Sequence, residues 1–168
     1  LVQIELKRRG IELKEAFNQV NRYRRHSYAS SYGLFQYVQL FVISNGVNTK
    51  YYSNTVRDGH LAEQRGKRGR PRSSNSFAFT SWWADAKNRP ITDLVGFTKT
   101  FFAKHTLLAI LTRYCVFDVD RKLLVMRPYQ IVAVESILLR IGTATNNNLL
   151  GSVAAGGYIW HTTGKIGR

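Results

Sequence analysis

The sequence predicts an α/β fold built around a hydrophobic core. Three observations point to this fold class: a strand pattern at the N-terminus, a helical pattern directly after it, and a nearly continuous apolar run typical of a buried strand. The chain has 168 residues, and a chain of this length can bury roughly 70% of the surface that it exposes when unfolded. We therefore expect a globular protein of one domain or slightly more.

The first strand is expected at Leu1–Lys7, where apolar and polar residues alternate with period two. Its two faces are an apolar one made of Val2, Ile4 and Leu6 and a polar one made of Gln3, Glu5 and Lys7. After Gly10, a helix is expected from Ile11 to about Arg25. Its apolar face consists of Leu13, Ala16, Phe17 and Val20. We expect this helix to pack beside the first strand.

Two further strands are expected at Leu34–Ile43 and Thr49–Ser53, joined by a turn at Ser44–Gly46. The first of them is almost continuously apolar, which indicates a strand buried on both faces. The composition then changes, because residues 57–76 are rich in Gly, Arg, Lys, Ser and Pro and have no apolar period. We expect this stretch to be a basic, flexible surface insertion.

Packing is expected to resume with the aromatic residues Phe77–Phe79 and Trp82–Trp83. Thr92 is the expected N-cap of a helix that runs through Lys104. A second helical pattern runs from His105 to about Tyr114. This part of the chain is therefore predicted to be mainly helical.

The last third of the chain is predicted as strand, helix, loop and strand. The first of these is an apolar strand at Lys122–Met126, and the helix follows Arg127 and ends near Ile141. The apolar face of this helix consists of Ile131, Val134, Ile137 and Leu138. Gly142–Gly157 reads as a connecting loop before a short terminal strand at Tyr158–Trp160.

Charge is the strongest compositional signal, because 25 Lys and Arg residues face 10 Asp and Glu residues, for a formal net charge of +15. Such a balance favours nucleic acid as a partner, although basic proteins of membrane surfaces share it. The longest apolar run, Val38–Ile43, is interrupted by Gln39. We expect a soluble protein with no membrane span and no signal peptide, and an excerpt from something longer.

Metal binding by cysteine or histidine is not expected. Cys115 is the single cysteine and lies in an apolar context, so we expect a buried structural thiol and an intracellular protein. The four histidines have no ligand spacing with one another or with the cysteine: His26, His60, His105 and His161. No zinc site is predicted.

The polar face of the first strand is the main candidate for chemistry. Glu5 and Lys7 lie about 6.6 Å apart along the strand at roughly 3.3 Å per residue. A carboxylate can bind Mg²⁺, and a nearby lysine can position a water molecule and offset charge on a scissile phosphate. Gln19 and Tyr23 lie four residues apart on the following helix and can point at the same cleft. The alternative is an ordinary solvated strand face with an interfacial Gln and Tyr.

Several motifs resemble one known family. They begin with Val2–Gly10, Glu15–Tyr23 and Phe41–Gly46, and continue with Lys104–Leu108, Leu124–Gln130 and Gly156–Gly164. Together they span most of the chain. They resemble the nuclease domain of the R (restriction and translocation) subunit of type I restriction-modification enzymes.

The resemblance implies a fold and an activity. The fold would be a restriction-endonuclease-like PD-(D/E)xK mixed sheet with flanking helices, lacking its N-terminal part, over residues 1–118. Residues 119–168 would be a linker and the first elements of a RecA-like helicase motor. Glu5 and Lys7 match the ExK half of the catalytic motif, and Gln19 and Tyr23 match its QxxxY element.

By the same resemblance, the complete subunit would cleave double-stranded DNA with Mg²⁺ and would move along DNA with ATP. Its partners would be the methyltransferase (M) and specificity (S) subunits, in the cytoplasm of a bacterium or archaeon. Glu5 would bind the metal, and Lys7 would stabilise the attacked phosphate or position water. The family's metal-binding Asp lies on a strand before the ExK strand, outside this chain. We therefore expect this segment alone to be inactive.

The end of the chain departs from the family's phosphate-binding loop. The family sequence is Thr-Gly-Ser-Gly-Lys-Thr, whereas Thr162, Thr163 and Gly164 are followed by Lys165, and Gly167 stands at the family's lysine position. A loop without that lysine and the hydroxyl that holds Mg²⁺ is not expected to bind ATP. Gln130 resembles the adenine-reading Gln of related helicases, with an ordinary helix-starting residue as the alternative.

The basic insertion offers a different function. Arg68, Arg70 and Arg72 lie in a Gly-Arg-Pro context that resembles an AT-hook, an extended arm that places arginines in a narrow minor groove. A solvated basic loop is the alternative. The second functional hypothesis is therefore a non-catalytic basic DNA-binding remnant without nuclease or ATPase activity.

Overall fold

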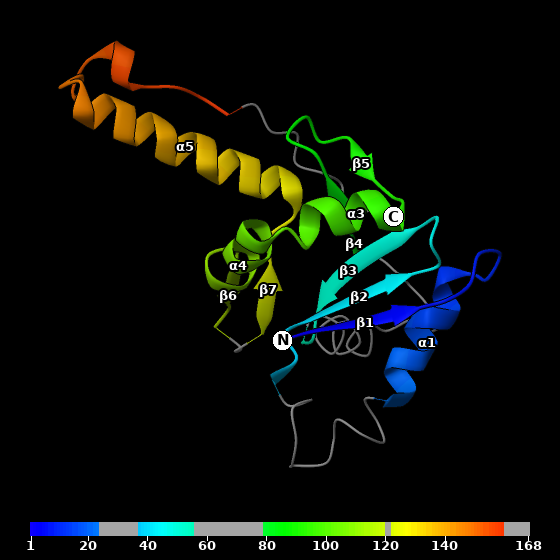
Figure 1. The fold of residues 1–168 in the computed structure, drawn as a ribbon. Coiled ribbons are helices and arrows are strands. Elements are labelled where there is room, and N and C mark those ends of the chain that lie inside the picture. Colours follow the sequence, from blue (N-terminus) through cyan, green and yellow to red (C-terminus); the bar gives the residue numbers. More distant parts are fainter. Residues whose placement is uncertain (24–36, 56–78, 120–121, 160–168) are drawn as a thin grey trace, which may run out of the picture.

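The computed structural model describes residues 1–23, 37–55, 79–119 and 122–159. A five-stranded mixed sheet forms its centre, in the order β1-β2-β3-β4-β5, with a separate two-stranded hairpin of β6 and β7 (Figure 1). The strands are β1 Val2–Leu6, β2 Leu40–Ser44, β3 Thr49–Ser53, β4 Ser81–Ala84, β5 Pro90–Ile91, β6 Cys115–Phe117 and β7 Leu123–Val125. The helices are α1 Leu13–Tyr23, α3 Leu94–Phe101, α4 Lys104–Thr112, α5 Pro128–Asn146 and the short 3₁₀ helix η3 Val153–Ala155.

The mixed α/β class is confirmed. β1 pairs with β2 in parallel, and the pairs from β2 to β5 are antiparallel. The strands expected at the N-terminus, at Thr49–Ser53 and at Lys122–Met126 are present as β1, β3 and β7. Of the strand expected at Leu34–Ile43, residues 37–39 are described and are not in a strand. The strand begins at Leu40, as β2, and all five residues of β2 are buried. The restriction-endonuclease-like and RecA-like assignments and the domain division at residue 118 stay predictions.

The turn between β2 and β3 also holds the start of α1. The Asn45 side chain accepts hydrogen bonds from the backbone N–H groups of Val47 (3.2 Å) and Asn48 (2.8 Å). Gly46 has φ of +85°, a left-handed conformation that favours glycine. The Asn45 amide nitrogen donates to the Ile11 carbonyl at 2.7 Å. This bond fixes the loop that leads from β1 into α1 against the end of the sheet.

Two core clusters lie on opposite faces of the sheet. On one face, α1 packs on β2 and β3 through Ala16, Phe17, Val20, Val38, Phe41, Ile43 and Tyr52. On the other face, α3 and α4 pack through Leu40, Val42, Tyr51, Trp83, Phe97, Phe101, Ile110 and Tyr114. Alternate residues of β2 and β3 enter the two clusters, as period-two side chains of a doubly covered strand should. We call these faces the α1 face and the α3/α4 face.

The helix expected from Thr92 through Lys104 is wrong in both its cap and its length. Asp93 is the N-cap of α3, and its carboxylate accepts from the Gly96 N–H at 2.7 Å. The chain bends by 71° after α3, and α4 begins at Lys104. The bend lets Phe101 and Ile110 enter the same buried cluster from two helices. A single straight helix would turn one of them away from the sheet.

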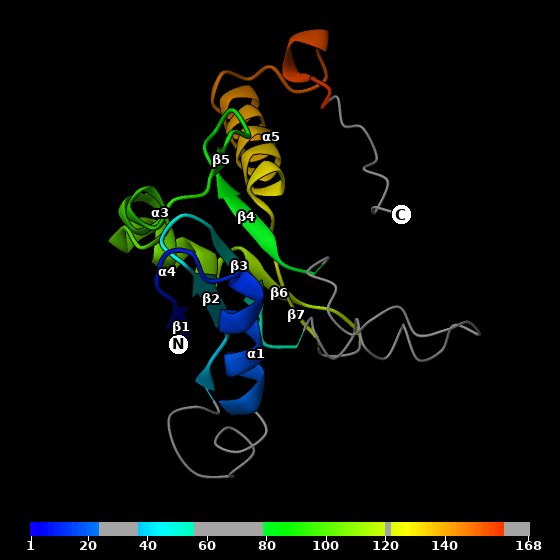
Figure 2. The same cartoon turned by 90° about the vertical axis from the view of Figure 1, so that its right-hand side faces the viewer.

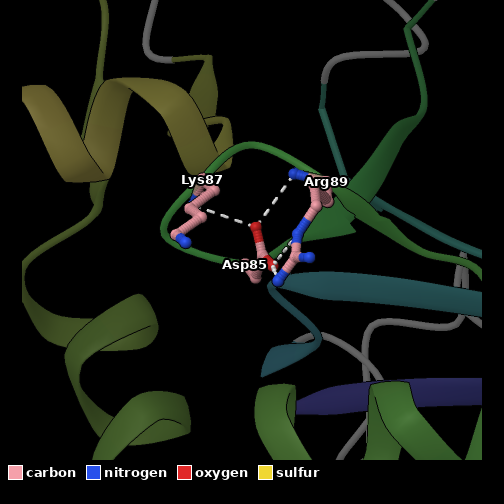
Figure 3. Close-up of polar contacts among 3 residues, drawn as sticks. All are labelled: Asp85, Lys87 and Arg89. Atoms are coloured by element: carbon pink, nitrogen blue, oxygen red, sulfur yellow. Dashed lines mark hydrogen bonds and ion pairs between the residues drawn. The ribbon is translucent and has the colours of Figure 1, made fainter.

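β4 and β5 form a hairpin that the sequence patterns did not predict as strands. Its turn is organised by Asp85, as Figure 3 shows. The Asp85 carboxylate accepts hydrogen bonds from the backbone N–H groups of Lys87 and Arg89, both at 2.9 Å, and pairs with the Arg89 guanidinium at 2.7 Å. Asn88 takes a left-handed conformation with φ of +59°. These local bonds lower the pKa of the Asp85 carboxyl.

The C-terminal part differs from the expectation in three ways. β6 was not predicted. α5 continues to Asn146, so the first residues of the expected Gly142–Gly157 loop are helical, and Tyr158 and Ile159 are not in a strand. Ile131 packs on the α3/α4 cluster, but most of the later apolar residues of α5 are exposed, because α5 extends away from the sheet (Figures 1 and 2). The exposed ones include Ile137, Leu138, Leu139 and Ile141.

Within the described ranges, no single helix is long and apolar enough to cross a membrane. α3 and α4 meet the length and composition criteria only as a bent pair.

Candidate functional site

Glu5 and Lys7 lie on the α1 face of β1. In the sheet register Glu5 is the partner of Ile43, a residue of the α1-face cluster. Glu5 is 8% exposed, and its Oε1 lies 3.3 Å from the Lys7 ammonium nitrogen. A nearly buried carboxylate needs a partner, because taking its charge out of water is costly. Lys7 supplies that partner.

Gln19 and Tyr23 join the same cluster from α1. The Lys7 ammonium donates a hydrogen bond to the Gln19 side-chain oxygen, and the Gln19 amide nitrogen donates to the Tyr23 hydroxyl. The two α1 residues are four positions apart, so they lie one helical turn apart on the same side. The four residues that sequence analysis grouped are therefore in one continuous chain of contacts: Glu5, Lys7, Gln19 and Tyr23. We call this chain the Glu5 network.

The burial along β1 is the reverse of its hydropathy. Ile4 is 41% exposed and Leu6 is 55% exposed, whereas Glu5 between them is nearly buried. α1 covers the polar side of this strand, which is a border strand of the sheet, and on the apolar side only Val2 packs against the α3/α4 cluster. Burying a carboxylate while leaving two aliphatic side chains in contact with water does not favour stability. Packing alone therefore does not account for the burial of Glu5.

The chemistry that the Glu5 network can perform follows from its donors and acceptors. Lys7 is a triple donor, engaged with one carboxylate and one amide in this structure, and it can offer a hydrogen bond to an anion. Glu5 can provide one hard oxygen ligand to a divalent cation. In the described ranges, no group of three or more His, Cys, Asp or Glu residues could hold a metal ion. Mg²⁺ is usually bound by one or two carboxylates, with water and substrate phosphates completing its shell, so one carboxylate fits part of such a site.

Gln130 is engaged as a helix cap. Its side-chain oxygen accepts from the Arg127 N–H at 2.8 Å, at the start of α5. The structure thus contains the helix-starting arrangement, and the adenine-reading role stays a prediction. The other predicted contact residues lie outside the described ranges: Arg68, Arg70, Arg72, Thr162, Thr163 and Gly164.

Cys115 lies on β6 and packs against the α3/α4 cluster. It is partly buried, and this burial raises the pKa of its thiol. Both observations agree with a structural thiol. Burial also lowers the pKa of Lys50, whose ammonium lies 4.7 Å from the centre of the Trp82 ring.

Two residues were not assigned a role from the sequence. Asn45 positions α1 through its hydrogen bond to the Ile11 carbonyl. The Asn-Gly turn pattern is the sequence feature that could have identified this residue. Gln3 lies on the same side of β1 as Glu5 and Lys7, and the same period-two pattern contained it.

The chain is similar to several known proteins. Residues 1–60 match the family model "Type I restriction enzyme R protein N terminus". The chain is 52% identical over 141 residues to the "Type I restriction enzyme EcoprrI endonuclease subunit" of Escherichia coli, an alignment that covers 84% of this chain and 41% of that protein. It is 44% identical over 166 residues to the SauCOLORF180P endonuclease subunit of Staphylococcus aureus (strain COL), covering 98% of this chain and 15% of that protein. A Staphylococcus saprophyticus subunit, SsaAORF53P, is 45% identical over 166 residues.

The chain spans less than half the length of these relatives, between 15% and 41%.

Proposed function

Since this chain belongs to the family of endonuclease (R) subunits of type I restriction enzymes, we propose that it carries part of the nuclease site of such a subunit. The reaction is the hydrolysis of a phosphodiester bond in double-stranded DNA, with Mg²⁺ as cofactor. The observation that carries the proposal is the Glu5 network: a nearly buried carboxylate, a lysine, an amide and a phenol in one chain of contacts. The formal charge of +15 is consistent with a polyanionic substrate.

Each residue of the network has a distinct role in this proposal. Glu5 holds the metal ion through its carboxylate. Lys7 donates a hydrogen bond to the attacked phosphate or to the attacking water. Gln19 positions the Lys7 ammonium by accepting one of its protons, and Tyr23 fixes the Gln19 amide. A bound Mg²⁺ would supply Lewis-acid stabilisation of the phosphate and a more acidic water.

In this proposal the complete subunit also binds ATP, moves along DNA and assembles with methyltransferase and specificity subunits. The names of the relatives describe them as endonuclease subunits of type I restriction enzymes, which supports the place of this chain in such a multi-subunit enzyme. In this proposal the chain alone does not cleave DNA, because the metal-binding Asp of the family lies outside it. It does not bind ATP, because its phosphate-loop sequence lacks the lysine of the family. Isothermal titration of the chain with Mg-ATP should therefore give no measurable heat of binding. Micromolar affinity would contradict this part.

The nuclease proposal is tested by Glu5→Ala and Lys7→Ala in the complete subunit, assembled with its partner subunits. Each variant should lose DNA cleavage by at least about a hundredfold, the size of a typical acid–base or metal-ligand contribution. ATP-driven translocation should continue, which shows that the variants are folded. Glu5→Ala should also weaken Mn²⁺ binding, whereas Lys7→Ala should leave it intact or strengthen it by removing a competing cation. Cleavage retained by Lys7→Ala would contradict the assignment.

A second candidate function is supported by charge alone. In this alternative, the chain is a basic DNA-binding remnant with no enzymatic activity. Replacing Arg68, Arg70 and Arg72 by neutral residues should then flatten the slope of log K against log salt for duplex DNA, by about 0.9 for each lost phosphate contact. An unchanged slope would exclude the basic insertion as a contact.

A further inference from the structure

Gln3 shares a strand and a side with the two charged residues of the site. β1 pairs with β2 so that Gln3 is the partner of Phe41 and Glu5 is the partner of Ile43. Both of these partners belong to the α1-face cluster, so Gln3 and Glu5 project to the α1 face. Successive residues on one side of a strand are about 6.6 Å apart. The carboxamide of Gln3 therefore starts one strand repeat from Glu5.

The Gln3 amide is available for a ligand. The residue is half-buried, and its side chain forms no hydrogen bond with any described residue. Its neighbour across the sheet is an aromatic ring, Phe41, which offers neither a donor nor an acceptor. Glu5, Lys7, Gln19 and Tyr23, by contrast, all have side-chain partners. A half-buried amide without a partner among the described residues can be served by water or by a bound molecule.

The chemistry of the amide favours a phosphate as that molecule. A glutamine side chain can donate two hydrogen bonds without bringing a charge. Glu5 already places a negative charge on this side of β1, and that charge repels a phosphate. The Gln3 amide is neutral, so it can donate a hydrogen bond to a phosphate without adding to the repulsion. More than half of all protein–DNA hydrogen bonds go to phosphate and sugar groups, and glutamine is one of the side chains that form them.

We infer that Gln3 is a positioning residue of the nuclease site, whose amide donates a hydrogen bond to a backbone phosphate of the bound DNA next to the cleaved bond. The inference rests on the proposed nuclease function. The contact holds the DNA strand in line with Glu5 and Lys7. It therefore affects the rate of DNA cleavage and leaves the rate of ATP-driven translocation unchanged.

The test uses two substitutions in the complete, assembled subunit. Gln3→Leu removes the amide, and Gln3→Glu replaces it by a carboxylate of the same size. The matched control is Ile4→Ala, which changes the neighbouring residue on the other side of the same strand, where 41% of it is exposed. The rate of cleavage is measured at saturating plasmid DNA as a function of salt, with ATP-driven translocation as the measure of folding and assembly.

Gln3→Leu should slow cleavage by about ten- to a hundredfold, the loss expected for one hydrogen bond to a charged group. The deficit should be the same at low and high salt, because a neutral donor is removed. Gln3→Glu should be slower still at low salt and should recover part of its deficit as salt screens the repulsion between carboxylate and phosphate. Ile4→Ala should cleave at the unsubstituted rate.

Three outcomes would overturn the inference. One is normal cleavage by both Gln3 variants. Another is equal slowing by both at every salt concentration, which indicates a structural effect. The third is faster cleavage or tighter Mn²⁺ binding by Gln3→Glu, which indicates a metal ligand. If Glu5→Ala itself cleaves DNA, the proposed function fails, whereas an inactive Glu5→Ala with normal Gln3 variants removes only the role of Gln3.

Discussion

Both faces of the sheet bury polar side chains, and the partners of Tyr51 and Ser53 on one face differ in kind from those within the Glu5 network on the other. On the α3/α4 face, the Tyr51 hydroxyl donates to the Met126 carbonyl at 3.1 Å, and the Ser53 hydroxyl donates to the Leu123 carbonyl. On the α1 face, the polar groups of the Glu5 network contact one another. Backbone carbonyls can change partners only if the chain moves. Side chains can turn toward a ligand while the backbone stays in place.

The difference separates two uses of a buried polar group. The bonds of Tyr51 and Ser53 join β3 to the β7 segment, about 70 residues later in the chain, and so hold distant parts of the fold together. The Glu5 network joins residues of one strand and the next helix, and places a carboxylate and an ammonium at the border of the sheet. The first arrangement stabilises the fold, and the second is the one on which the proposed nuclease site rests.

The largest expected effect on stability is at the centre of the α3/α4 cluster. The Phe101 ring is fully buried and contacts the rings of Tyr51, Trp83, Phe97 and Phe102. Phe101→Ala should lower the free energy of unfolding by about 3–5 kcal/mol, because it leaves a cavity among aromatic side chains. Urea unfolding followed by tryptophan fluorescence measures this. Leu139→Ala on α5, 74% exposed, is the control and should change stability by less than about 0.5 kcal/mol.

The same substitution on the two faces makes a sharper comparison. Tyr51→Phe removes one hydroxyl and leaves the Met126 carbonyl without that donor, so it should cost about 1–2 kcal/mol of unfolding free energy. Tyr23→Phe removes a hydroxyl from a residue that is 39% exposed and should cost less than about 0.5 kcal/mol. Chemical denaturation of both variants gives the two values. Equal losses of unfolding free energy in Tyr51→Phe and Tyr23→Phe would show that the two hydroxyls contribute equally to stability, against the distinction drawn between the two faces.

The Cys115 thiol tests the packing of β6 on the α3/α4 face. Burial raises its pKa, so a smaller fraction is thiolate at pH 8 than for a free cysteine, and its reaction with iodoacetamide should be several-fold slower. In the folded protein, the rate of the iodoacetamide reaction should rise with pH over a higher pH range than it does in the urea-unfolded chain. A native rate equal to the unfolded rate would show that the thiol is fully open to solvent.

The smallest effect is expected at the β4–β5 turn. The bonds to Arg89 and Lys87 lower the pKa of the Asp85 carboxyl in the folded state (Figure 3). A depressed folded pKa means that the stabilisation is present above the ordinary pKa of about 3.9 and is lost as the pH falls through the folded value. NMR titration should place this carboxyl below its ordinary range. Asp85→Asn should remove the corresponding pH dependence of stability, and an unshifted titration would contradict the arrangement.

Local sequence patterns were sufficient to predict a strand or helix wherever the segment has a strong hydrophobic period and packs on one side only. The period-two pattern found β1, the helical stripe found α1, and the apolar residues Leu123–Val125 marked β7. The spacing of Gln19 and Tyr23 on a helix placed both on one side, and the structure brings them to Lys7. Two short strands were missed, β5 with two residues and β6 with three, because so few residues show no period. β7 is also three residues long and was found only because it lies in a longer apolar run.

By itself, the sequence determined which residues share a side of a strand or helix, because side-chain direction follows from local backbone geometry. It therefore grouped Glu5 with Lys7 and Gln19 with Tyr23 before any contact was known. Only the tertiary structure decided which side is covered. Glu5 is buried and Leu6 is exposed because α1 lies over the polar side of β1, held there by Asn45. Burial of a border strand depends on the elements packed against it, and those are set by contacts between residues far apart in the chain.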